Sequence, residues 1–416
     1  MSELQHVDIA IIGGGMVGAS LAALLPDSLS VALLESFPMP AMDAKIPQYQ
    51  PSYDARSTAL SHSSYAIFEQ AGIWPLLRQH VEPIQQVHVS DKGNWGSTVM
   101  DHQSEGLEAL GFVVENAWLG RSLLHFLQHN TAVNFLCPAT VHQVRPQADG
   151  AEIEYRLGRD DTTPVRKLTA KLVVVADGAR SQICSSLGIH TNVTDYQHTA
   201  IVTNVSTSEP HQGIAYERFT ANGPLALLPL TAQDGENRSA LIWTMPSDIA
   251  EPLIDAADSA FLAALQDTFG RRMGEFRRVG QRHAYPLMLT TVDEQVRRHL
   301  VVLGNAAHSL HPVAGQGFNL ALRDVQVLAN LIADGQKTVR SAGDLTLLEE
   351  YQRQQLLDQK TTALFSDVLP GLFARRQLPL VVGRGMGLLA LELVPSLKSS
   401  FVRFATGMRQ HSGGGY

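Results

Sequence analysis

Hydrophobic positions along the chain gather in short, nearly continuous runs. Residues 6–12 and 30–34 are mostly apolar, and residues 172–176 and 300–303 are entirely apolar. Such runs are typical of strands that are buried on both faces of a parallel sheet. Helical segments follow several of them, and the leucines of residues 119–129 fall on one face of a predicted amphipathic helix. The pattern therefore predicts an α/β fold with a parallel sheet.

A glycine-rich loop, GGGMVG at residues 13–18, joins the first run to a predicted helix over 19–25. Gly13, Gly15 and Gly18 would serve a tight turn, close approach of the backbone to a pyrophosphate, and close packing of helix on strand. Free N–H groups at the start of the helix would attract an anion. Glu35 ends the second strand, where a carboxylate would accept hydrogen bonds from an adenosine ribose. These features predict a dinucleotide site; the alternative is a glycine-rich turn in an ordinary α/β domain.

The pattern changes between residues 196 and 289, where strand-like runs alternate with polar turns. Predicted strands cover 199–205, 213–219, 225–230 and 240–244, and one predicted helix covers 255–269. This indicates a mostly antiparallel sheet, which can form one wall of a substrate cavity at a domain junction. Candidate lining residues are Tyr216, Arg218, Trp243 and Tyr285, although buried aromatic residues more often belong to a core.

Three regions follow from these patterns. The predicted nucleotide-binding domain is Rossmann-like and discontinuous, and the antiparallel sheet is inserted into it as a substrate domain. The chain from residue 345 is helical in character, with predicted helices over 345–365, 369–373 and 378–404. The predicted boundaries are 1–82, 102–195 and 284–345 for the nucleotide domain, 83–101 and 196–283 for the substrate domain, and 346–416 for the C-terminal helical region.

A second candidate site follows the apolar run at 172–176. Asp177 and Gly178 would place a carboxylate and exposed backbone beside the ligand crevice of the sheet. The alternative is a plain strand-to-helix turn in which Asp177 caps the helix.

A third candidate site spans residues 304–319, after the run at 300–303. Gly304 permits close backbone approach, and Asn305 offers a donor and an acceptor to a polyol. Gly315 and Gly317 open a predicted helix over 318–331, whose first N–H groups favour negative charge nearby.

Several other side chains have two interpretations. Arg56 could clamp a phosphate, but a surface pair with Asp54 is favoured. Arg121 could reach the edge of a cofactor or be an exposed charge in the first turn of its helix. His308 and His311 lack a third ligand at a suitable spacing, so we expect a structural histidine and no metal site.

Composition narrows the class of protein. Of the 416 residues, 44% are apolar and 17% are charged, which allows a large core, and the net charge of -8 argues against nucleic acid as a partner. The two cysteines, Cys137 and Cys184, fit a reducing cytoplasm and offer no disulfide framework. No signal peptide and no spanning helix is predicted, so we expect a cytoplasmic protein.

The three motifs occur in an order that resembles the flavoprotein aromatic hydroxylases of the para-hydroxybenzoate hydroxylase type. They are GGGMVG with Glu35, DGARS at 177–181, and GNAAHSLHPVAGQGFN at 304–319, and the resemblance covers nearly the whole chain. Four stretches are similar to the ubiquinone-biosynthesis branch of that family: HVSDKG at 88–93, YERFTANGPLALLPL at 216–230, AYPLMLT at 284–290 and LPLVVGRGMGLLALEL at 378–393.

The resemblance implies FAD as the cofactor and assigns roles by position. Asn305 stands where most of the family has aspartate facing the ribityl chain, which weakens the charge but keeps the hydrogen bonding. The implied FAD-binding residues are Gly13, Gly15 and Gly18 at the pyrophosphate, Glu35 at the ribose, Arg56 and Arg121 at the flavin, Asp177 and Gly178 at the pyrophosphate, Gly304 at a close backbone approach, Asn305 at the ribityl chain, and Pro312, Gly315, Gly317 and Asn319 beside the isoalloxazine ring.

The resemblance also implies an activity: hydroxylation of a polyprenylated methoxyphenol in ubiquinone biosynthesis, with O2, through a flavin C4a-hydroperoxide. The electron donor would be NAD(P)H or an electron-transfer partner, and a contact with the inner membrane or a biosynthetic complex is expected because the substrate is a lipid. The sequence identifies no catalytic side chain and no oligomeric state. Two alternatives stay open, a hydroxylase of a soluble aromatic and a non-catalytic flavin-binding subunit of a complex.

Overall fold

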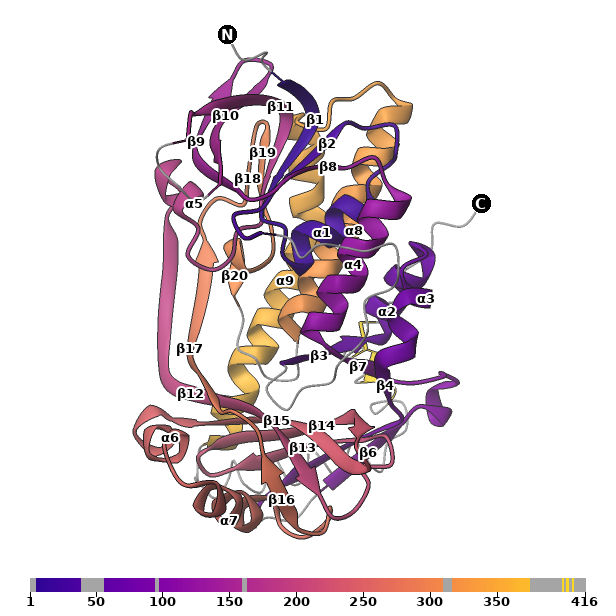
Figure 1. The fold of residues 1–416 in the computed structure, drawn as a ribbon, viewed down its shortest axis with the longest axis vertical. Coiled ribbons are helices and arrows are strands. Elements are labelled where there is room, and N and C mark those ends of the chain that lie inside the picture. The colour runs from indigo at the N-terminus through magenta and orange to yellow at the C-terminus, as the bar shows by residue number, and fades with distance from the viewer. Residues whose placement is uncertain are drawn as a thin grey trace.

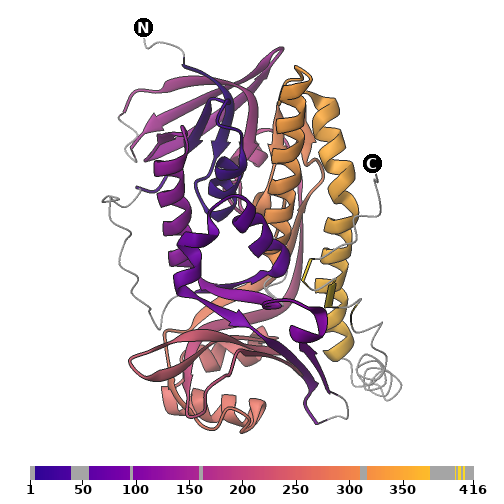
Figure 2. The same ribbon diagram turned by 90° about the vertical axis from the view of Figure 1, so that its right-hand side faces the viewer.

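The computed structural model describes residues 5–38, 56–93, 97–158, 163–309 and 316–374, with residues 399, 402–403 and 406–407. Figure 1 shows an elongated molecule with a sheet at each end and a group of long helices beside the first sheet. A view turned by 90° shows the two longest helices side by side (Figure 2). No helix among the described residues is long and apolar enough to cross a membrane.

The first sheet has eight strands and a parallel centre. Its order is β18-β19-β11-β1-β2-β8, and the β9–β10 hairpin pairs antiparallel with β11. The predicted apolar runs are its central strands, so the predicted α/β fold is confirmed. The strands are β1 (Gln5–Ile12), β2 (Val31–Leu34), β8 (Asn134–Leu136), β9 (Ala139–Gln147), β10 (Gly150–Leu157), β11 (Arg166–Val175), β18 (Val296–Arg297) and β19 (Leu300–Val302).

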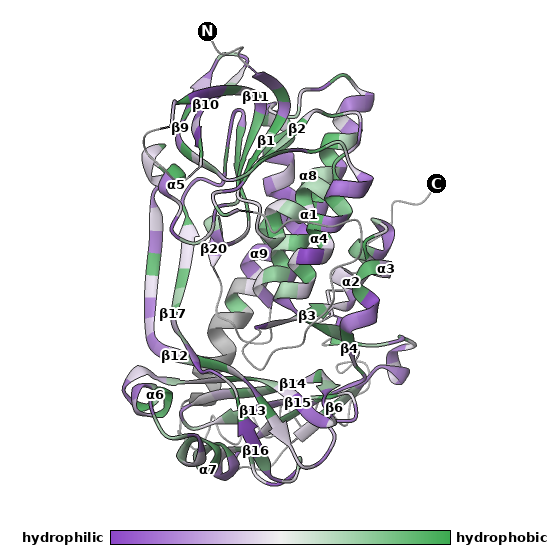
Figure 3. Ribbon diagram, in the orientation of Figure 1, coloured by the Kyte–Doolittle hydropathy of each residue, from purple (hydrophilic) through white to green (hydrophobic). Residues whose placement is uncertain are grey.

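Both faces of this sheet are buried, which explains its continuous apolar runs. Ile9 and Ile11 of β1 pack with the long helices, whereas Ala10 and Ile12 pack on the opposite face. Figure 3 shows hydrophobic residues on these strands and on the helices beside them. The helices are α1 (Met16–Leu24), α4 (Asn116–Asn130), α8 (Gln316–Lys337) and α9 (Leu345–Ala374) on one side, with the short α5 (Gln182–Ser186) on the other.

The second sheet has nine strands, and all of its pairs are antiparallel except β13 with β5. The predicted antiparallel sheet is therefore confirmed, while the domain boundaries stay a prediction. Its order is β20-β17-β12-β15-β14-β13-β5-β6, with β16 on β12. The strands are β5 (Gln86–Asp91), β6 (Ser97–Asp101), β12 (Thr191–Thr207), β13 (Ile214–Thr220), β14 (Gly223–Gln233), β15 (Glu236–Pro246), β16 (Phe276–Val279), β17 (His283–Val292) and β20 (His308–Ser309).

Two helices, α6 (Ser247–Ile254) and α7 (Asp258–Phe269), cover the outer face of the second sheet (Figure 1). The predicted single helix over 255–269 is wrong at its start, because Asp255 is the C-cap of α6 and α7 begins at Asp258. Pro252 lies inside α6, where proline lacks the N–H that a helix needs, so the local sequence gives no helical signal there.

A three-stranded sheet lies on the inner face of the second sheet, with short helices beside it. Residues 57–61 form a strand, and Ser61 at its end then caps α2. The C-terminal helix is continuous through 345–374, where two separate segments were predicted. The elements of this layer are β3 (Ser57–Ser61), β4 (Val81–Ile84), β7 (Gly111–Glu115), α2 (His62–Gln70), α3 (Trp74–Leu77), and the 3-10 helices η1 (Arg78–His80) and η2 (Gln103–Glu105). A further 3-10 helix, η3 (Gly304–Ala306), follows β19.

Candidate functional site

A cleft of about 550 Å³ lies at the carboxyl ends of the central parallel strands. In an open α/β sheet, ligands bind at this edge, beyond the carboxyl ends of the strands. All three motifs contribute to it, although they are far apart in the sequence. Its lining includes Gly13, Gly15, Met16 and Val17 after β1, Glu35, Ser36 and Phe37 after β2, Asp177, Gly178 and Arg180 after β11, Leu303 and Asn305 after β19, and Gly317, Phe318 and Ala321 of α8.

Three glycines of the first loop, Gly13, Gly15 and Gly18, each lack a side chain for a different local reason. Gly13 has φ of +106°, and a Cβ there would lie 2.4 Å from the Ala176 carbonyl oxygen. A Cβ on Gly18 would lie 2.0 Å from the Gly13 carbonyl oxygen, so α1 can pack against its loop only with glycine here. A Cβ on Gly15 would meet nothing within 4 Å. Gly15 therefore leaves open space at the N-terminus of α1, on the cleft side.

Glu35 is held at the edge of the cleft by backbone donors. Its Oε2 accepts a hydrogen bond from the Gly14 N–H at 2.7 Å, and its Oε1 accepts one from the Phe37 N–H at 2.8 Å. An ionised carboxylate has about four acceptor positions. Glu35 therefore keeps acceptor capacity for a diol that enters the cleft.

Asp177 lies on the cleft and does not cap a helix. The N-cap of α5 is Ser181, whose Oγ accepts from the Cys184 N–H at 3.0 Å and donates to Asp177 Oδ2 at 2.9 Å. The helix-cap alternative for Asp177 is therefore wrong. Desolvation raises the pKa of Asp177, and the bond from Ser181 opposes that rise. Gly178 follows with φ of +99°, so the chain turns away sharply along the cleft.

The third motif brings η3 and the start of α8 to the same cleft. A Cβ on Gly304 would lie 2.9 Å from a methyl carbon of Val17, so η3 approaches α1 closely. Asn305 is exposed, and both Asn305 and Gly317 line the cleft. Pro312 and Gly315 lie outside the described residues.

Asn319 is buried, and its side chain is used for structure. Its Oδ1 accepts from the Ser61 N–H at 2.8 Å and the Ser64 hydroxyl at 2.7 Å, and its Nδ2 donates to the Ala59 carbonyl at 2.8 Å. These bonds join α8 to β3 and α2. The side chain is not among the residues that line the cleft. Its predicted place beside the cofactor ring stays a prediction.

Neither predicted arginine lines the cleft. Arg56 is exposed, and its guanidinium lies 5.7 Å from the ring centroid of Tyr285. Arg121 is exposed on α4. Asp54, the alternative partner of Arg56, lies outside the described residues. Contacts of these two arginines with a cofactor stay a prediction.

The family of FAD binding domains matches residues 6–363 of this chain. The chain belongs to this FAD-binding family. It is 35% identical over 403 residues to the ubiquinone hydroxylase UbiL of Rhodospirillum rubrum. The aligned residues cover 96% of this chain and 89% of that relative. It is 28% identical to the 3-demethoxyubiquinol 3-hydroxylase of Escherichia coli, over 97% of this chain and 99% of that one.

Solved structures share the fold. The p-nitrophenol 4-monooxygenase PnpA from Pseudomonas putida superposes with a TM-score of 0.76 at 16% identity, over 98% of this chain and 100% of that chain. A single-residue variant of HpxO from Klebsiella pneumoniae, complexed with FAD, superposes with a TM-score of 0.71 at 16% identity, over 96% of this chain and 99% of that chain. Together with the family match, these findings place the chain among the FAD-dependent aromatic hydroxylases, with FAD as its cofactor.

The cleft of this FAD-binding protein fits the cofactor. No side chain caps the N-terminus of α1, and its first turn holds no acidic residue, so its N–H groups are available to the pyrophosphate. The open space at Gly15 would admit the phosphates, Glu35 would accept hydrogen bonds from the ribose hydroxyls, and Asn305 would form hydrogen bonds with the ribityl chain. When bound and reduced, FAD supplies the chemistry that activates oxygen.

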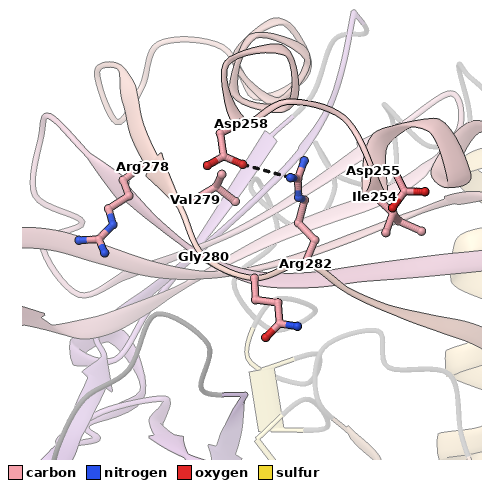
Figure 4. Close-up of a pocket in the computed structure, with 8 residues that line it drawn as sticks. Ile254, Asp255, Asp258, Arg278, Val279, Gly280 and Arg282 are labelled. Atoms are coloured by element: carbon pink, nitrogen blue, oxygen red, sulfur yellow. Dashed lines mark hydrogen bonds and ion pairs between the residues drawn. The ribbon is translucent and has the colours of Figure 1, made fainter.

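A second depression, of about 460 Å³, lies beside α6 and α7 on the far side of the second sheet (Figure 4). Arg282 points into it, but its guanidinium donates to the carbonyls of Leu253 and Ala256 at 3.2 and 2.6 Å and pairs with Asp258 at 3.1 Å. These bonds complete the C-terminal end of α6. We therefore assign this depression a structural role.

A buried polar pair lies behind the cleft of the FAD-binding fold. His308 Nε2 is 3.3 Å from Asp324 Oδ2 on α8, and Gln359 donates to both carboxylate oxygens at 3.1 and 3.2 Å. Burial lowers the pKa of His308 to about 4 and raises the pKa of Asp324 to about 8. Among the described residues, no group of three metal-ligating side chains exists, and His311 lies outside them.

The His308–Asp324 pair should make the protein less stable as the pH rises from about 6.5 to about 8. In this window the folded pair keeps one proton, whereas both side chains of the unfolded chain have lost theirs. Below about pH 6.5, His308 of the unfolded chain also holds a proton, so the folded and unfolded chains bind the same number of protons and stability no longer changes with pH. The free energy of unfolding should fall by up to about 1.4 kcal/mol per pH unit. Urea unfolding of wild type and Asp324→Asn between about pH 6 and about pH 9 measures this, and equal slopes would contradict the raised pKa of Asp324.

Proposed function

We propose that this protein is an FAD-dependent monooxygenase that hydroxylates the ring of a polyprenylated methoxyphenol in ubiquinone biosynthesis. The substrate would be of the type taken by 2-octaprenyl-6-methoxyphenol hydroxylase. The observation that carries the proposal is the full-length similarity to relatives named ubiquinone hydroxylases, at 35% identity for the first of them. The cleft supports it, because the three motifs of the flavin-dependent hydroxylases line one continuous surface.

The second sheet supports a ring that carries an apolar tail. Its inner face, toward β3, β4 and β7, includes a cluster of apolar side chains. An apolar wall at a domain junction binds such a substrate and keeps water away from the reacting oxygen. The chain has no second glycine fingerprint, so NAD(P)H would bind only transiently or an electron-transfer partner would reduce the flavin. From the second sheet the cluster contains Met100, Ala215, Leu230 and Ala240, and from the segments packed on that sheet it contains Ile84, Leu110, Val113 and Val402.

Mass spectrometry of quinone intermediates in cells that lack this chain tests the proposal. We expect loss of ubiquinone and accumulation of a prenylphenol that lacks one ring hydroxyl, with recovery when the wild-type chain is restored. Normal ubiquinone with no accumulated intermediate would contradict the assignment. Turnover of a soluble phenol by the purified protein, with normal ubiquinone in the cells, would favour a hydroxylase of soluble aromatics. Flavin that reoxidises without product would favour a non-catalytic subunit.

A further inference from the structure

Glu217 lies in the middle of β13, on the inner face of the second sheet. Its neighbours Tyr216 and Arg218 point outward, toward α7. The ring centroids of Tyr216 and Phe269 lie 5.4 Å apart, and Arg218 Nε donates to the Thr268 carbonyl at 3.2 Å. Successive side chains of a strand alternate between the two faces of a sheet. Glu217 therefore shares the inner face with Ala215, which packs in the apolar cluster beneath β3, β4 and β7.

The surroundings of Glu217 are apolar. It pairs with Val89 of β5 and Ala226 of β14, which lie beside it on the same face. Among the residues that the structure describes, none donates a hydrogen bond to Glu217 or forms an ion pair with it. On the layer above, Glu115 of β7 pairs with Arg238 at 3.0 Å, and the pKa of Glu82 of β4 is raised by burial and lowered by the charge of His211.

Burial without a partner raises the pKa of Glu217 to about 7. The side chain nevertheless keeps part of its surface accessible. A carboxyl group with a raised pKa among apolar side chains, still accessible from one side, marks a candidate functional site. β13 belongs to the sheet that forms one wall of the proposed substrate cavity, and two other strands of that sheet, β17 and β20, contact η3, which carries Asn305.

We propose that Glu217 is a catalytic residue that takes the proton from the aromatic hydroxyl of the substrate. The O–H bond of the phenol breaks, its proton moves to a carboxylate oxygen of Glu217, and the electron pair stays on the phenol oxygen. The phenolate ring is then rich enough in electrons to be hydroxylated, and Glu217 later returns its proton to water. The inference rests on the proposed function, since it needs a substrate with an aromatic hydroxyl. A general base is most effective when it titrates near the working pH.

Steady-state kinetics of the FAD-loaded enzyme with a short-chain prenylated methoxyphenol tests this role. For Glu217→Gln, which keeps the shape and removes the base, we expect kcat to fall about 10²-fold with little change in KM, and the acid limb of the pH profile near 7 to disappear. Glu217→Asp should keep that limb. Glu275→Gln is the matched control, since Glu275 is an exposed carboxylate beside β16 of the same sheet, and it should behave as wild type. A wild-type pH profile in Glu217→Gln would overturn the proposal.

Ultraviolet titration of the same phenol bound to the oxidised enzyme separates this inference from the proposed function. The ionised carboxylate of Glu217 opposes formation of a phenolate beside it, so the bound phenol should ionise at a lower pH in Glu217→Gln than in wild type. Equal ionisation in the two proteins would overturn the role of Glu217, whether or not either protein turns over. Wild type that ionises the phenol but forms no hydroxylated product would overturn the proposed function alone.

Discussion

Replacing Gly18 with alanine should give a protein that retains no FAD after purification. The added Cβ would lie 2.0 Å from the Gly13 carbonyl oxygen, a backbone atom that cannot rotate away. Relief requires α1 to move off β1 or the loop to change its path, and either movement displaces the N–H groups that face the cleft. Overpacking of this kind costs about 1–3 kcal/mol in stability. Flavin absorbance per chain and the free energy of unfolding without cofactor measure the two effects.

Gly15→Ala is the control for the stability effect, because it adds the same methyl group to the loop without a backbone clash. A Cβ on Gly15 meets no atom within 4 Å, and the backbone of Gly15 has φ of -65°, which alanine adopts freely. The protein without cofactor should therefore unfold within about 0.5 kcal/mol of wild type. The methyl group points into the space assigned to the pyrophosphate, so FAD should bind more weakly. Wild-type FAD affinity in this variant would contradict the placement of the pyrophosphate beside Gly15.

The strands and glycines of the cleft could be predicted because their signals are local. A strand buried on both faces must be apolar throughout, and β1 is so because Ile9 and Ala10 face two different cores. The order of strand, glycine loop, helix and carboxylate then fixes where Gly13 and Glu35 meet. Nothing beyond neighbouring residues is needed for these predictions.

Partners that are distant in the sequence could not be predicted. Asn319 matches a motif beside the cofactor, yet its side chain bonds to Ser61 and Ser64, which lie more than 250 residues away. The motif fixes the start of α8, but the contacts of the side chain depend on how β3 and α2 pack against that helix. A motif therefore locates the backbone of a site better than it assigns each side chain.

The inner face of the second sheet was missed for a related reason. Alternation predicts a strand around residues 213–219 but does not say which face is covered by which layer. Tyr216 and Trp243 were considered as lining residues because they are aromatic, and both pack against α7 in the outer core. Glu217, between two outward side chains, faces the apolar wall. A lone acid at an inward position of a strand is the signal that could have identified it.

Arg238 and Glu115 form a buried ion pair that no sequence pattern indicates. Arg238 of β15 is fully buried, and Glu115 at the end of β7 is 4% exposed. Arg238 Nη2 lies 3.0 Å from Glu115 Oε1. The pair joins the second sheet to the three-stranded sheet, so it fixes how the apolar wall and Glu217 lie over the layer above. Two charged residues 123 positions apart give no local sign that they meet.

Replacing Arg238 with methionine should cost about 3–5 kcal/mol of stability, because the carboxylate of Glu115 would stay buried without its cation. The double variant with Glu115→Leu should recover much of this loss, since neutral side chains of similar size carry no desolvation penalty. Urea unfolding of the wild type, both single variants and the double variant gives the coupling energy. A loss below about 1 kcal/mol in Arg238→Met, or additive losses in the double variant, would show that the two sheets do not depend on this pair for their packing.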